Sequence, residues 1–576
     1  SVLGLVFPDI FPEQFKGSNG VVHVYFEAVA VILTLALMGQ VLEARAHRKT
    51  NAAVKELIKL SPSQATRIIN GIEVLVDIDL IEKGHSLRVK PGDKIPVDGF
   101  ITEGESYIDE SMITGEPSPV FKVLNEIVTA GTINGNQSFI MQADRVGAET
   151  LLAQIIDMVN KASRSQAPIQ KLADRISSYF VPIVVGISIL TFIVWSIWGP
   201  DPAYVFALVN AIAVLIIACP CALGLATPMS VMVGIGKAAR NGILVKNAEA
   251  IQQMNKIDTL IVDKTATLTE GKPSVENLVS LTENYDEKTI LLWMASVNQS
   301  SEHPLAEACL EYAKKKHIIP EKVGLFQSVP GQGVKAFFNK KRIAIGNQKL
   351  MTSIEISIPE SIQNEIKQLQ KKAKTISYLS VDAELVAYIV LSDQIKETSR
   401  QAISELNAKG IEVIMLTGDN TNTAKAVAKE LGIHKFEAEQ YPHDKLQYVE
   451  QIQKAGHVVA MAGDGINDAP ALAKSDIGIA MGTGTGVAIE SADMTLIKGD
   501  LLGIVKAKNL SDAVMKNIKQ NLFFALAYNT IGVPIAAGIL YPMFGLLLSP
   551  MIAALAMSFS SVSVIGNALR LRSKKI

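Results

Sequence analysis

The stretch Leu260–Gly271 reads LIVDKTATLTEG, and within a few residues it passes from apolar side chains to an acid, a lysine and several threonines. Its apolar start predicts a buried parallel strand, and in open α/β sheets the reactive groups collect just beyond the carboxyl ends of the strands. Asp263 occupies that place, where an aspartate can attack phosphate as a covalent nucleophile. Lys264, Thr265 and Thr267 would supply a charge and hydroxyl donors to the phosphoryl oxygens. Taken alone, this pattern is more typical of a strand followed by a polar turn.

Two later stretches repeat the pattern of an apolar strand that ends in acids and hydroxyl groups. They are VIMLTGDN (413–420), which ends in Thr417 and Asp419, and VVAMAGDGINDAPAL (458–472), which places Asp464 and Asp468 in a tight turn. A single acidic turn after a strand is a common structural Asx-turn. Three in one domain, spaced for intervening helices, instead predict one site whose carboxylates suit Mg²⁺ and a substrate phosphate.

The length and composition indicate a membrane protein with several domains. At 576 residues the chain is too long for a single core, and 48% of its residues are hydrophobic. Its 55 basic and 56 acidic residues balance, so the charge gives no sign of nucleic-acid binding. Three cysteines, two of them separated by one residue, cannot form a disulfide framework.

Five apolar stretches are long enough, at about 20 residues, to cross a bilayer. We expect these spans at Phe26–Leu42, Tyr179–Trp198, Val205–Leu225, Leu522–Leu540 and Phe544–Ile565. The polar blocks after the first and third spans are large enough to be domains. Basic residues flank the spans on one side: Arg45, Arg48 and Lys49, Lys161, Arg164 and Lys171, Lys237 and Arg240, and the C-terminal RLRSKKI. The positive-inside rule therefore predicts cytoplasmic domains and a cytoplasmic C-terminus. Residue 1 would then lie outside, so we read the chain as a fragment that lacks at least one preceding helix.

The motifs together resemble the P-type ATPases of the heavy-metal class, and the bacterial copper exporters most of all. The family signature DKTGT stands here as DKTAT, and the other family motifs occur in family order: TGE (114–116), CPC (219–221), SEHPL (301–305), TGDN (417–420) and GDGIND (463–468). There is no G-x-x-x-x-G-K-[ST] sequence, so a P-loop is not supported. The resemblance covers essentially the whole chain.

This resemblance implies a multidomain membrane protein. It would combine an α-helical transmembrane bundle with a β-rich actuator domain, an α/β haloacid-dehalogenase-like phosphorylation domain and an α+β nucleotide-binding domain. The expected segments are an external segment (1–25), a transmembrane helix (26–45), the actuator domain (46–165), two transmembrane helices with a linker (166–245), the phosphorylation domain (246–272 and 387–508), the nucleotide-binding domain (273–386), and two transmembrane helices with a tail (509–576).

The resemblance also implies roles for single residues. Asp263 would carry the phosphate, with Lys264, Thr265, Thr417, Asp419 and Lys445 around it, and Asp464 and Asp468 would share the Mg²⁺ site with Asp263. Glu116 would orient water for hydrolysis of the acyl phosphate. ATP would bind through Glu302, His303, Gly331, Gly333, Gly346 and Asn347. In isolation, a histidine or a pair of glycines carries little weight, and the TGE sequence is also ordinary turn composition.

The stretch IIACPCALG points to the transported ion. Pro220 interrupts the helix within the third span and frees backbone carbonyls, and the thiolates of Cys219 and Cys221 favour soft monovalent copper or zinc-like metals. By resemblance, the copper ligands would be Cys219, Cys221, Tyr528, Asn529, Met557 and Ser561, together with Ser560 in the family pattern. Glu43 and Asp174 would lie where copper comes in and Glu27 where it leaves, although acids near span ends also occur as simple interfacial residues.

We therefore expect ATP-driven export of Cu⁺ across a bacterial plasma membrane through a phosphoaspartate cycle. The expected cofactors are ATP and Mg²⁺, a soluble copper chaperone or small thiol would donate the copper, and a monomer would be the functional form. Open alternatives are a silver, zinc or cadmium exporter and a non-transporting, phosphatase-like or inactivated chain. Two departures from the family pattern bear on activity: Ala266 replaces a glycine beside the phosphorylation site, and Gly486 replaces an aspartate. If the backbone at 266 has a positive φ, alanine there costs about 1 kcal/mol.

Overall fold

A computed structural model describes residues 59–574, apart from 115–117, 202, 219–220, 302, 373, 383, 466 and 483–489, together with eight residues between 6 and 41. The chain divides into two compact units, residues 1–255 with 507–576 and residues 256–506. The predicted sites Glu27, Glu43, Glu116, Cys219, Glu302 and Gly486 lie outside the described residues, as does most of the predicted span Phe26–Leu42.

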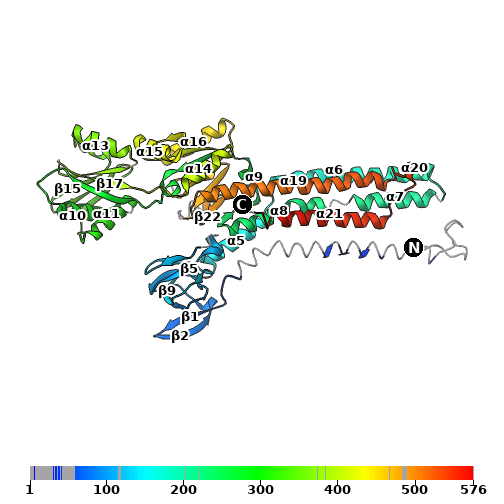
Figure 1. The fold of residues 1–576 in the computed structure, drawn as a ribbon, viewed down its shortest axis with the longest axis horizontal. Coiled ribbons are helices and arrows are strands. Elements are labelled where there is room, and N and C mark those ends of the chain that lie inside the picture. Colours follow the sequence, from blue (N-terminus) through cyan, green and yellow to red (C-terminus); the bar gives the residue numbers. More distant parts are fainter. Residues whose placement is uncertain are drawn as a thin grey trace. The chain divides into compact units, whose positions relative to one another are not determined.

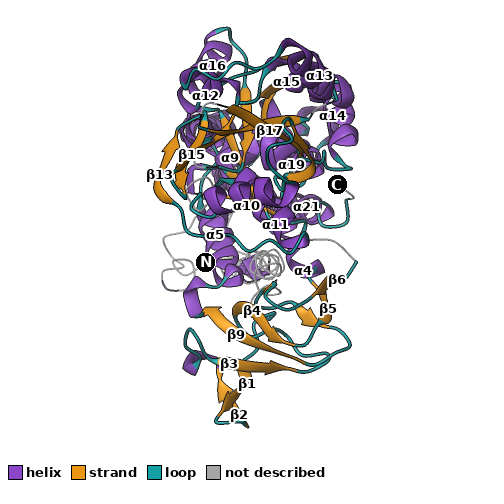
Figure 2. Ribbon diagram, turned by 90° about the vertical axis from the view of Figure 1, so that its left-hand side faces the viewer, coloured by secondary structure: helices purple, strands orange, loops and turns teal. Residues whose placement is uncertain are grey.

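In the first unit, residues 64–145 form antiparallel β-structure with little helix, as Figure 2 shows. One sheet has the order β2-β1-β3-β9-β4-β7 and a smaller one the order β6-β5-β8. The strands are β1 (Gln64–Ile69), β2 (Ile72–Asp77), β3 (Ser86–Val89), β4 (Asp98–Glu103), β5 (Ser106–Asp109), β6 (Val120–Lys122), β7 (Ile127–Val128), β8 (Ile133–Asn134) and β9 (Phe139–Arg145), with the short helix α4 (Ser111–Thr114) between β5 and β6. Inward-facing residues such as Leu87, Ile101 and Met141 alternate with polar ones along the strands and form a fully buried core.

The same unit contains long apolar helices that run side by side (Figure 1). They are α6 (Pro168–Trp198), α7 (Ala203–Ile217), α8 (Cys221–Arg240), α19 (Leu502–Ala536) and α21 (Pro550–Arg570). The unit also contains α5 (Leu151–Arg164), β10 (Ile243–Val245), α9 (Ala248–Lys256) and the short α20 (Tyr541–Phe544). Within the described part of the chain, three segments are long and apolar enough to cross a membrane: Leu151–Trp198, Ala203–Arg240 and Ile552–Arg570.

Two predicted spans differ from the helices that form. The predicted span Leu522–Leu540 lies in α19, which ends at Ala536 and is not among these three segments, because lysine, asparagine and glutamine side chains at 516–521 lower its hydropathy. The last span begins at Pro550 instead of Phe544. Gly545 ends α20 with φ 64°, and the Ser549 hydroxyl caps the start of α21 by accepting a hydrogen bond from the backbone N–H of Ile552.

The second unit contains a parallel α/β sheet in which the strands follow the order β22-β21-β20-β11-β18-β19. These strands are β11 (Thr259–Asp263), β18 (Glu412–Leu416), β19 (Lys435–Glu437), β20 (Val459–Gly463), β21 (Ile477–Met481) and β22 (Met494–Leu496). The helices α14 (Ser399–Ala408), α15 (Thr421–Leu431), α16 (Pro442–Lys454) and α17 (Ala469–Lys474) connect them. Both faces of the sheet are therefore covered, which explains the continuous apolar runs of β11 and β20.

Inserted after β11 is an antiparallel sheet with the order β12-β17-β16-β15-β14-β13. Its strands are β12 (Ser274–Ser280), β13 (Gly324–Val329), β14 (Gly333–Phe338), β15 (Lys341–Gly346), β16 (Thr375–Val381) and β17 (Glu384–Ser392). The helices α10 (Glu287–Asn298) and α11 (Pro304–Lys315) pack in one core on this sheet, and α12 (Gln348–Ser353) and α13 (Glu360–Gln370) pack in another. Because β17 pairs with β12 and β16 along its length, this lobe extends to Ser392 and crosses the boundary predicted at residue 386.

Candidate functional site

Three neighbouring parallel strands deliver the predicted acids to one place. β11 ends at Asp263, β18 leads into Thr417 and Asp419, and β20 leads into Asp464 and Asp468. β11 lies between the other two strands and pairs in parallel with both. The carboxylates of Asp263, Asp464 and Asp468 consequently lie within 4.8 Å of one another.

Lys445 contacts two of these carboxylates. It extends from the first turn of α16, and its Nζ lies 2.5 Å from Asp263 Oδ1 and 2.7 Å from Asp468 Oδ1. All three side chains are buried. One buried cation therefore offsets part of the charge of two buried anions, an arrangement that is costly unless each group is paired and hydrogen-bonded.

The turn after β11 holds the proposed nucleophile in place. The backbone N–H of Thr265 donates to Asp263 Oδ2 at 2.9 Å, which leaves the other carboxylate oxygen with Lys445. Lys264 turns to the neighbouring strand, and its Nζ lies 2.5 Å from Asp419 Oδ2. Thr417 is buried, and its hydroxyl accepts a hydrogen bond from the N–H of Asp419 at 3.1 Å. Each residue of the predicted catalytic set that the structure describes thus belongs to this one cluster.

Ala266 lies in this turn with φ 56° and ψ −5°. This is the left-handed region, which costs an alanine about 1 kcal/mol relative to glycine. Ala266 therefore has the positive φ at which an alanine in place of the family glycine is expected to cost stability.

Burial and neighbouring charges raise the pKa of two of the acids toward neutral pH. Burial raises the pKa of Asp263 to about 6, although the charge of Lys445 acts to lower it. Burial, with the charges of Asp263 and Asp468, also raises the pKa of Asp464 to about 6. Burial lowers the pKa of the Lys445 ammonium, but the two adjacent carboxylates raise it overall. Lys445 therefore stays charged, and most of the Asp263 population is ionised at pH 7.

The carboxylate cluster fits a hard divalent cation such as Mg²⁺. It offers oxygen ligands from three aspartates at close spacing, and it contains no sulfur or imidazole ligand. Burial raises the pKa of Asp464 most, and repulsion from Asp263 and Asp468 raises it further; a bound cation would relieve that repulsion. The residues present thus suit Mg²⁺, with Asp464 and Asp468 as its protein ligands beside Asp263.

Several residues that support the turn after β11 were not predicted from the sequence. The Thr269 hydroxyl bonds to Asp393 Oδ2, and the N–H of Gly271 donates to Asp393 Oδ1 at 3.1 Å. Lys396 Nζ donates to the carbonyls of Ala266 and Gly499 at 2.6 and 2.7 Å. The run DQIK (393–396) directly after β17 was the signal that could have identified Asp393 and Lys396.

The residues predicted to bind nucleotide have structural functions in the inserted lobe. The ring Nδ1 of His303 accepts a hydrogen bond from the N–H of Leu305 and caps α11. A Cβ at Gly333 would lie 2.2 Å from the carbonyl oxygen of Ile345, and one at Gly346 would lie 2.3 Å from that of Gln332. Close approach of β14 and β15 therefore requires both glycines whether or not a ligand binds.

Asn347 joins two parts of this lobe. It caps α12, and its amide also donates to the carbonyl of Gly331, which has φ 70°. His303 and Gly331 are exposed, so their surfaces remain open to a ligand.

In the membrane helices, some predicted copper ligands lie in buried positions. Asn529 of α19 and Ser561 of α21 are buried, Met557 is half-buried, and Tyr528 is 41% exposed. Cys221 is the first residue of α8. Asp174 is exposed on α6. The three helices that carry Cys221, Asn529 and Met557 pack in one core through Ala222, Ala525 and Val564.

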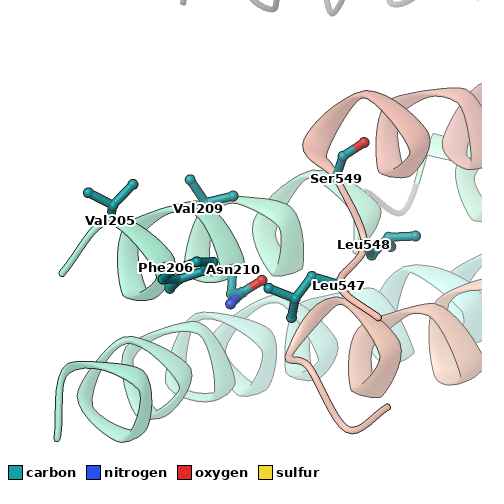
Figure 3. Close-up of a pocket in the computed structure, with 7 residues that line it drawn as sticks. All are labelled: Val205, Phe206, Val209, Asn210, Leu547, Leu548 and Ser549. Carbon is teal, nitrogen blue, oxygen red and sulfur yellow. The ribbon is translucent and has the colours of Figure 1, made fainter. Parts of the chain in front are cut away.

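Asn210 of α7 is a buried polar residue that was not predicted. Its side chain is fully buried, and neither of its amide atoms has a hydrogen-bond partner within the described part of the structure. It lines a cavity of about 230 Å³ with Phe206 and Leu547, and Figure 3 shows its amide beside Leu547.

Comparisons with known proteins agree with this fold. A profile of the P-type ATPase actuator domain matches residues 59–160, and one of the haloacid dehalogenase-like hydrolases matches residues 257–476. The chain belongs to the heavy-metal P-type ATPases, with their actuator, haloacid dehalogenase-like and nucleotide-binding domains, and it is a membrane-embedded ATP phosphohydrolase that transports ions.

Its relatives include exporters of two metals. A copper-exporting P-type ATPase of Legionella pneumophila is 52% identical over 99% of this chain and 77% of the relative. A silver exporting P-type ATPase of Salmonella typhimurium is 49% identical over 100% of this chain and 70% of the relative. The crystal structure of a zinc-transporting PIB-type ATPase in the E2.Pi state is 32% identical, with a TM-score of 0.57 over 94% of this chain and 87% of that structure.

Proposed function

We propose that the protein exports Cu⁺ across a bacterial plasma membrane and that each cycle passes through an aspartyl phosphate at Asp263. The observation that supports the phosphate chemistry best is the pairing of Asp263 with Lys445 beside two further carboxylates at the ends of adjacent parallel strands. The carboxylate is ionised at neutral pH, held by the N–H of Thr265, and next to a cation that could contact a phosphoryl oxygen.

In the proposed reaction, Asp263 attacks the γ-phosphorus of ATP. The bond to the bridging oxygen breaks, and ADP leaves. Lys445 stabilises the negative charge that develops on the transferred group, while Lys264 and Asp419 hold each other and fix the turn that presents Asp263. Mg²⁺ bound by Asp464 and Asp468 would neutralise phosphate charge. Glu116 would then position the water that hydrolyses the acyl phosphate.

ATP would bind to the inserted lobe at His303, Gly331, Gly333, Gly346 and Asn347, with Glu302 beside them. The exposed His303 ring could stack on or hydrogen-bond to adenine, and the exposed glycine turn allows close approach to a ligand.

The cargo is proposed from ligand softness. Cys219, Cys221 and Met557 supply sulfur, which suits Cu⁺, whereas a zinc site would normally include nitrogen or carboxylate ligands. The copper-exporting relatives support the same choice, and the 49% identical silver exporter makes Ag⁺ the second candidate. Copper would come in past Glu43 and Asp174 from a chaperone or small thiol on the cytoplasmic side and leave past Glu27. Tyr528, Asn529 and Ser561 would complete the site in a monomeric pump.

The proposal is tested by phosphorylation of the detergent-solubilised protein from labelled ATP with and without Cu⁺. The parent should form an acid-stable, hydroxylamine-sensitive phosphoenzyme that depends on copper, and Asp263→Asn should form none. Asp258→Asn is the matched control, because Asp258 lies just before the other end of β11, where it pairs with His457. Labelling that persists in Asp263→Asn would exclude this nucleophile, and labelling that zinc but not copper stimulates would exclude the cargo.

A further inference from the structure

A closed network of buried amides joins α8, α19 and α21. Ser230 Oγ donates to Asn517 Oδ1 at 2.8 Å, and Asn521 Nδ2 donates to Ser230 Oγ at 3.0 Å. Asn567 Nδ2 donates to Asn521 Oδ1 at 2.9 Å, while Asn517 Nδ2 donates to the Asn567 carbonyl at 2.8 Å. All four side chains are buried. We call Ser230, Asn517, Asn521 and Asn567 the amide layer.

The amide layer lies about two helical turns from a proposed ligand on each of the three helices. At a rise of about 1.5 Å per residue, Ser230 lies about 13 Å from Cys221 along α8, Asn521 about 12 Å from Asn529 along α19, and Asn567 about 9 Å from Ser561 along α21. α19 runs toward the proposed copper ligands from the amide layer, whereas α8 and α21 run from the ligands toward it. The layer therefore lies on one side of the proposed ligands on every helix that carries one.

Apolar packing alone does not set how these helices slide or rotate against one another inside a membrane. Lipid tails are as apolar as the side chains, so a small shift of one helix changes little hydrophobic burial. The amide layer does distinguish such shifts, because a displacement by one residue would separate several buried donors and acceptors at once. A single buried asparagine fixes helix register in this way in coiled coils.

The amide layer contacts α8 near a point where the backbone hydrogen bonding of that helix is interrupted. Pro228 lies inside α8 and cannot donate to the carbonyl of Gly224, so the helix is weakened between Cys221 and Ser230. Asn521 Nδ2 donates to the carbonyl of Ala226 at 3.4 Å, two residues beyond Gly224. The layer thus holds α8 next to the interruption in its own hydrogen-bond ladder.

We propose that the amide layer positions the ligand-bearing helices for copper binding. Its residues do not touch the ion. They set the register of α8, α19 and α21, and with it the spacing of Cys221, Asn529, Met557 and Ser561. This inference rests on the proposed function, because those residues are the proposed copper ligands.

The test compares Ser230→Ala and Asn521→Leu with the parent in two assays on the detergent-solubilised protein. Copper titration of ATP hydrolysis reports the ligand site, and phosphorylation by inorganic phosphate and Mg²⁺ without copper reports the catalytic unit. Positioning groups behind metal ligands typically alter metal affinity by 10- to 100-fold, so we expect the copper concentration for half-maximal stimulation to rise about tenfold in each variant. Phosphorylation by inorganic phosphate should stay at the parent level.

Ser188→Ala is the matched control. It also removes one buried hydrogen bond between helices, from Ser188 Oγ to the carbonyl of Ala211, but it links α6 to α7 outside the amide layer. Its copper titration should match that of the parent. Unchanged titrations in Ser230→Ala and Asn521→Leu would overturn the inference, as would an equal loss in both assays, which would indicate a merely structural role. A parent that does not respond to copper would instead reject the proposed function, and the inference with it.

Discussion

At the scale of single residues, the turn after β11 combines a strained backbone with a buried charge cluster. Ala266 has a positive φ, and Asp263, Lys445 and Asp468 share a site that contains more negative than positive charge. Both features lower the stability of the isolated fold, and both lie where phosphate and Mg²⁺ are expected to act. Strain and unbalanced charge of this kind are typical of functional sites.

Replacing Ala266 with glycine should stabilise the protein. Glycine adopts φ 56° without the Cβ penalty, although it gains entropy in the unfolded chain, so the net gain should be up to about 1 kcal/mol. Thermal unfolding of the detergent-solubilised variant measures it. Ala426→Gly, in the middle of α15, is the control and should lose about 1 kcal/mol. Equal losses in both variants would show that the turn at 266 is unstrained.

Asp464 should make stability depend on pH. Its pKa is raised to about 6 in the fold, so the folded state holds the proton more tightly, and the resulting stability is lost as pH rises from about 4 to above 6. Asp464→Asn lacks this loss and should be more stable than the parent at pH 7, by about 1 to 2 kcal/mol once solvent screening is allowed for. The difference should shrink toward pH 4.5.

Melting temperatures across pH 4.5 to 7.5, with and without Mg²⁺, measure this difference. Mg²⁺ should stabilise the parent more than Asp464→Asn, because the cation relieves the repulsion that the variant lacks. Asp201→Asn, which removes an exposed carboxylate, should follow the parent at each pH. A pH-independent difference between Asp464→Asn and the parent would contradict the shifted pKa.

At the scale of elements, the sequence predicted those strands and helices whose ends follow from a single local pattern of residues. The apolar runs that end in Asp263, Asp419 and Asp464 predicted three strand tips, and parallel pairing then required them to meet at one edge of the sheet. The contact of Lys445 with both Asp263 and Asp468 depends on how α16 packs, which no local pattern reveals. The same limit applies to the start of α21, where a glycine and a serine cap override the apolar run that begins at residue 544.

Asn210 provides a test of packing within the helices. Its buried amide has no hydrogen-bond partner within the described structure, so it bears a desolvation cost of about 1 to 3 kcal/mol. Asn210→Leu keeps the number and branching of the side-chain heavy atoms, removes that cost, and should raise the melting temperature. The same substitution at Asn521 should lower it, because Asn521 has partners on α8 and α21 that would lose theirs. A lower melting temperature for Asn210→Leu would show that the amide is satisfied in the folded protein.

At the scale of the whole molecule, the protein separates its chemistry by the hardness of its ligands. Carboxylate oxygens gather at Asp263, Asp464 and Asp468 in the second unit, whereas the proposed sulfur ligands Cys221 and Met557 belong to helices α8 and α21 of the first. A hard ion such as Mg²⁺ would therefore favour the carboxylate cluster, and a soft ion such as Cu⁺ would favour the proposed sulfur site. The family motifs predict this division from the sequence, and the sulfur site stays a prediction. The choice among copper, silver and zinc depends on side-chain geometry that motifs do not encode.

Met557→Leu tests that choice most directly. Leucine keeps the volume of methionine and removes the thioether, so the half-buried packing of α21 should change little while a soft ligand is lost. We expect the copper concentration that half-activates ATP hydrolysis to rise about tenfold, as when one metal ligand or its support is removed, with the melting temperature of the metal-free protein nearly unchanged. Met543→Leu, which removes the thioether of a highly exposed methionine in α20, is the matched control.

If sulfur softness selects the cargo, silver activation should weaken in parallel with copper activation, because both ions prefer thioethers to carboxylates. Zinc-stimulated hydrolysis that survives in Met557→Leu, with copper without effect on the parent, would assign the protein to zinc.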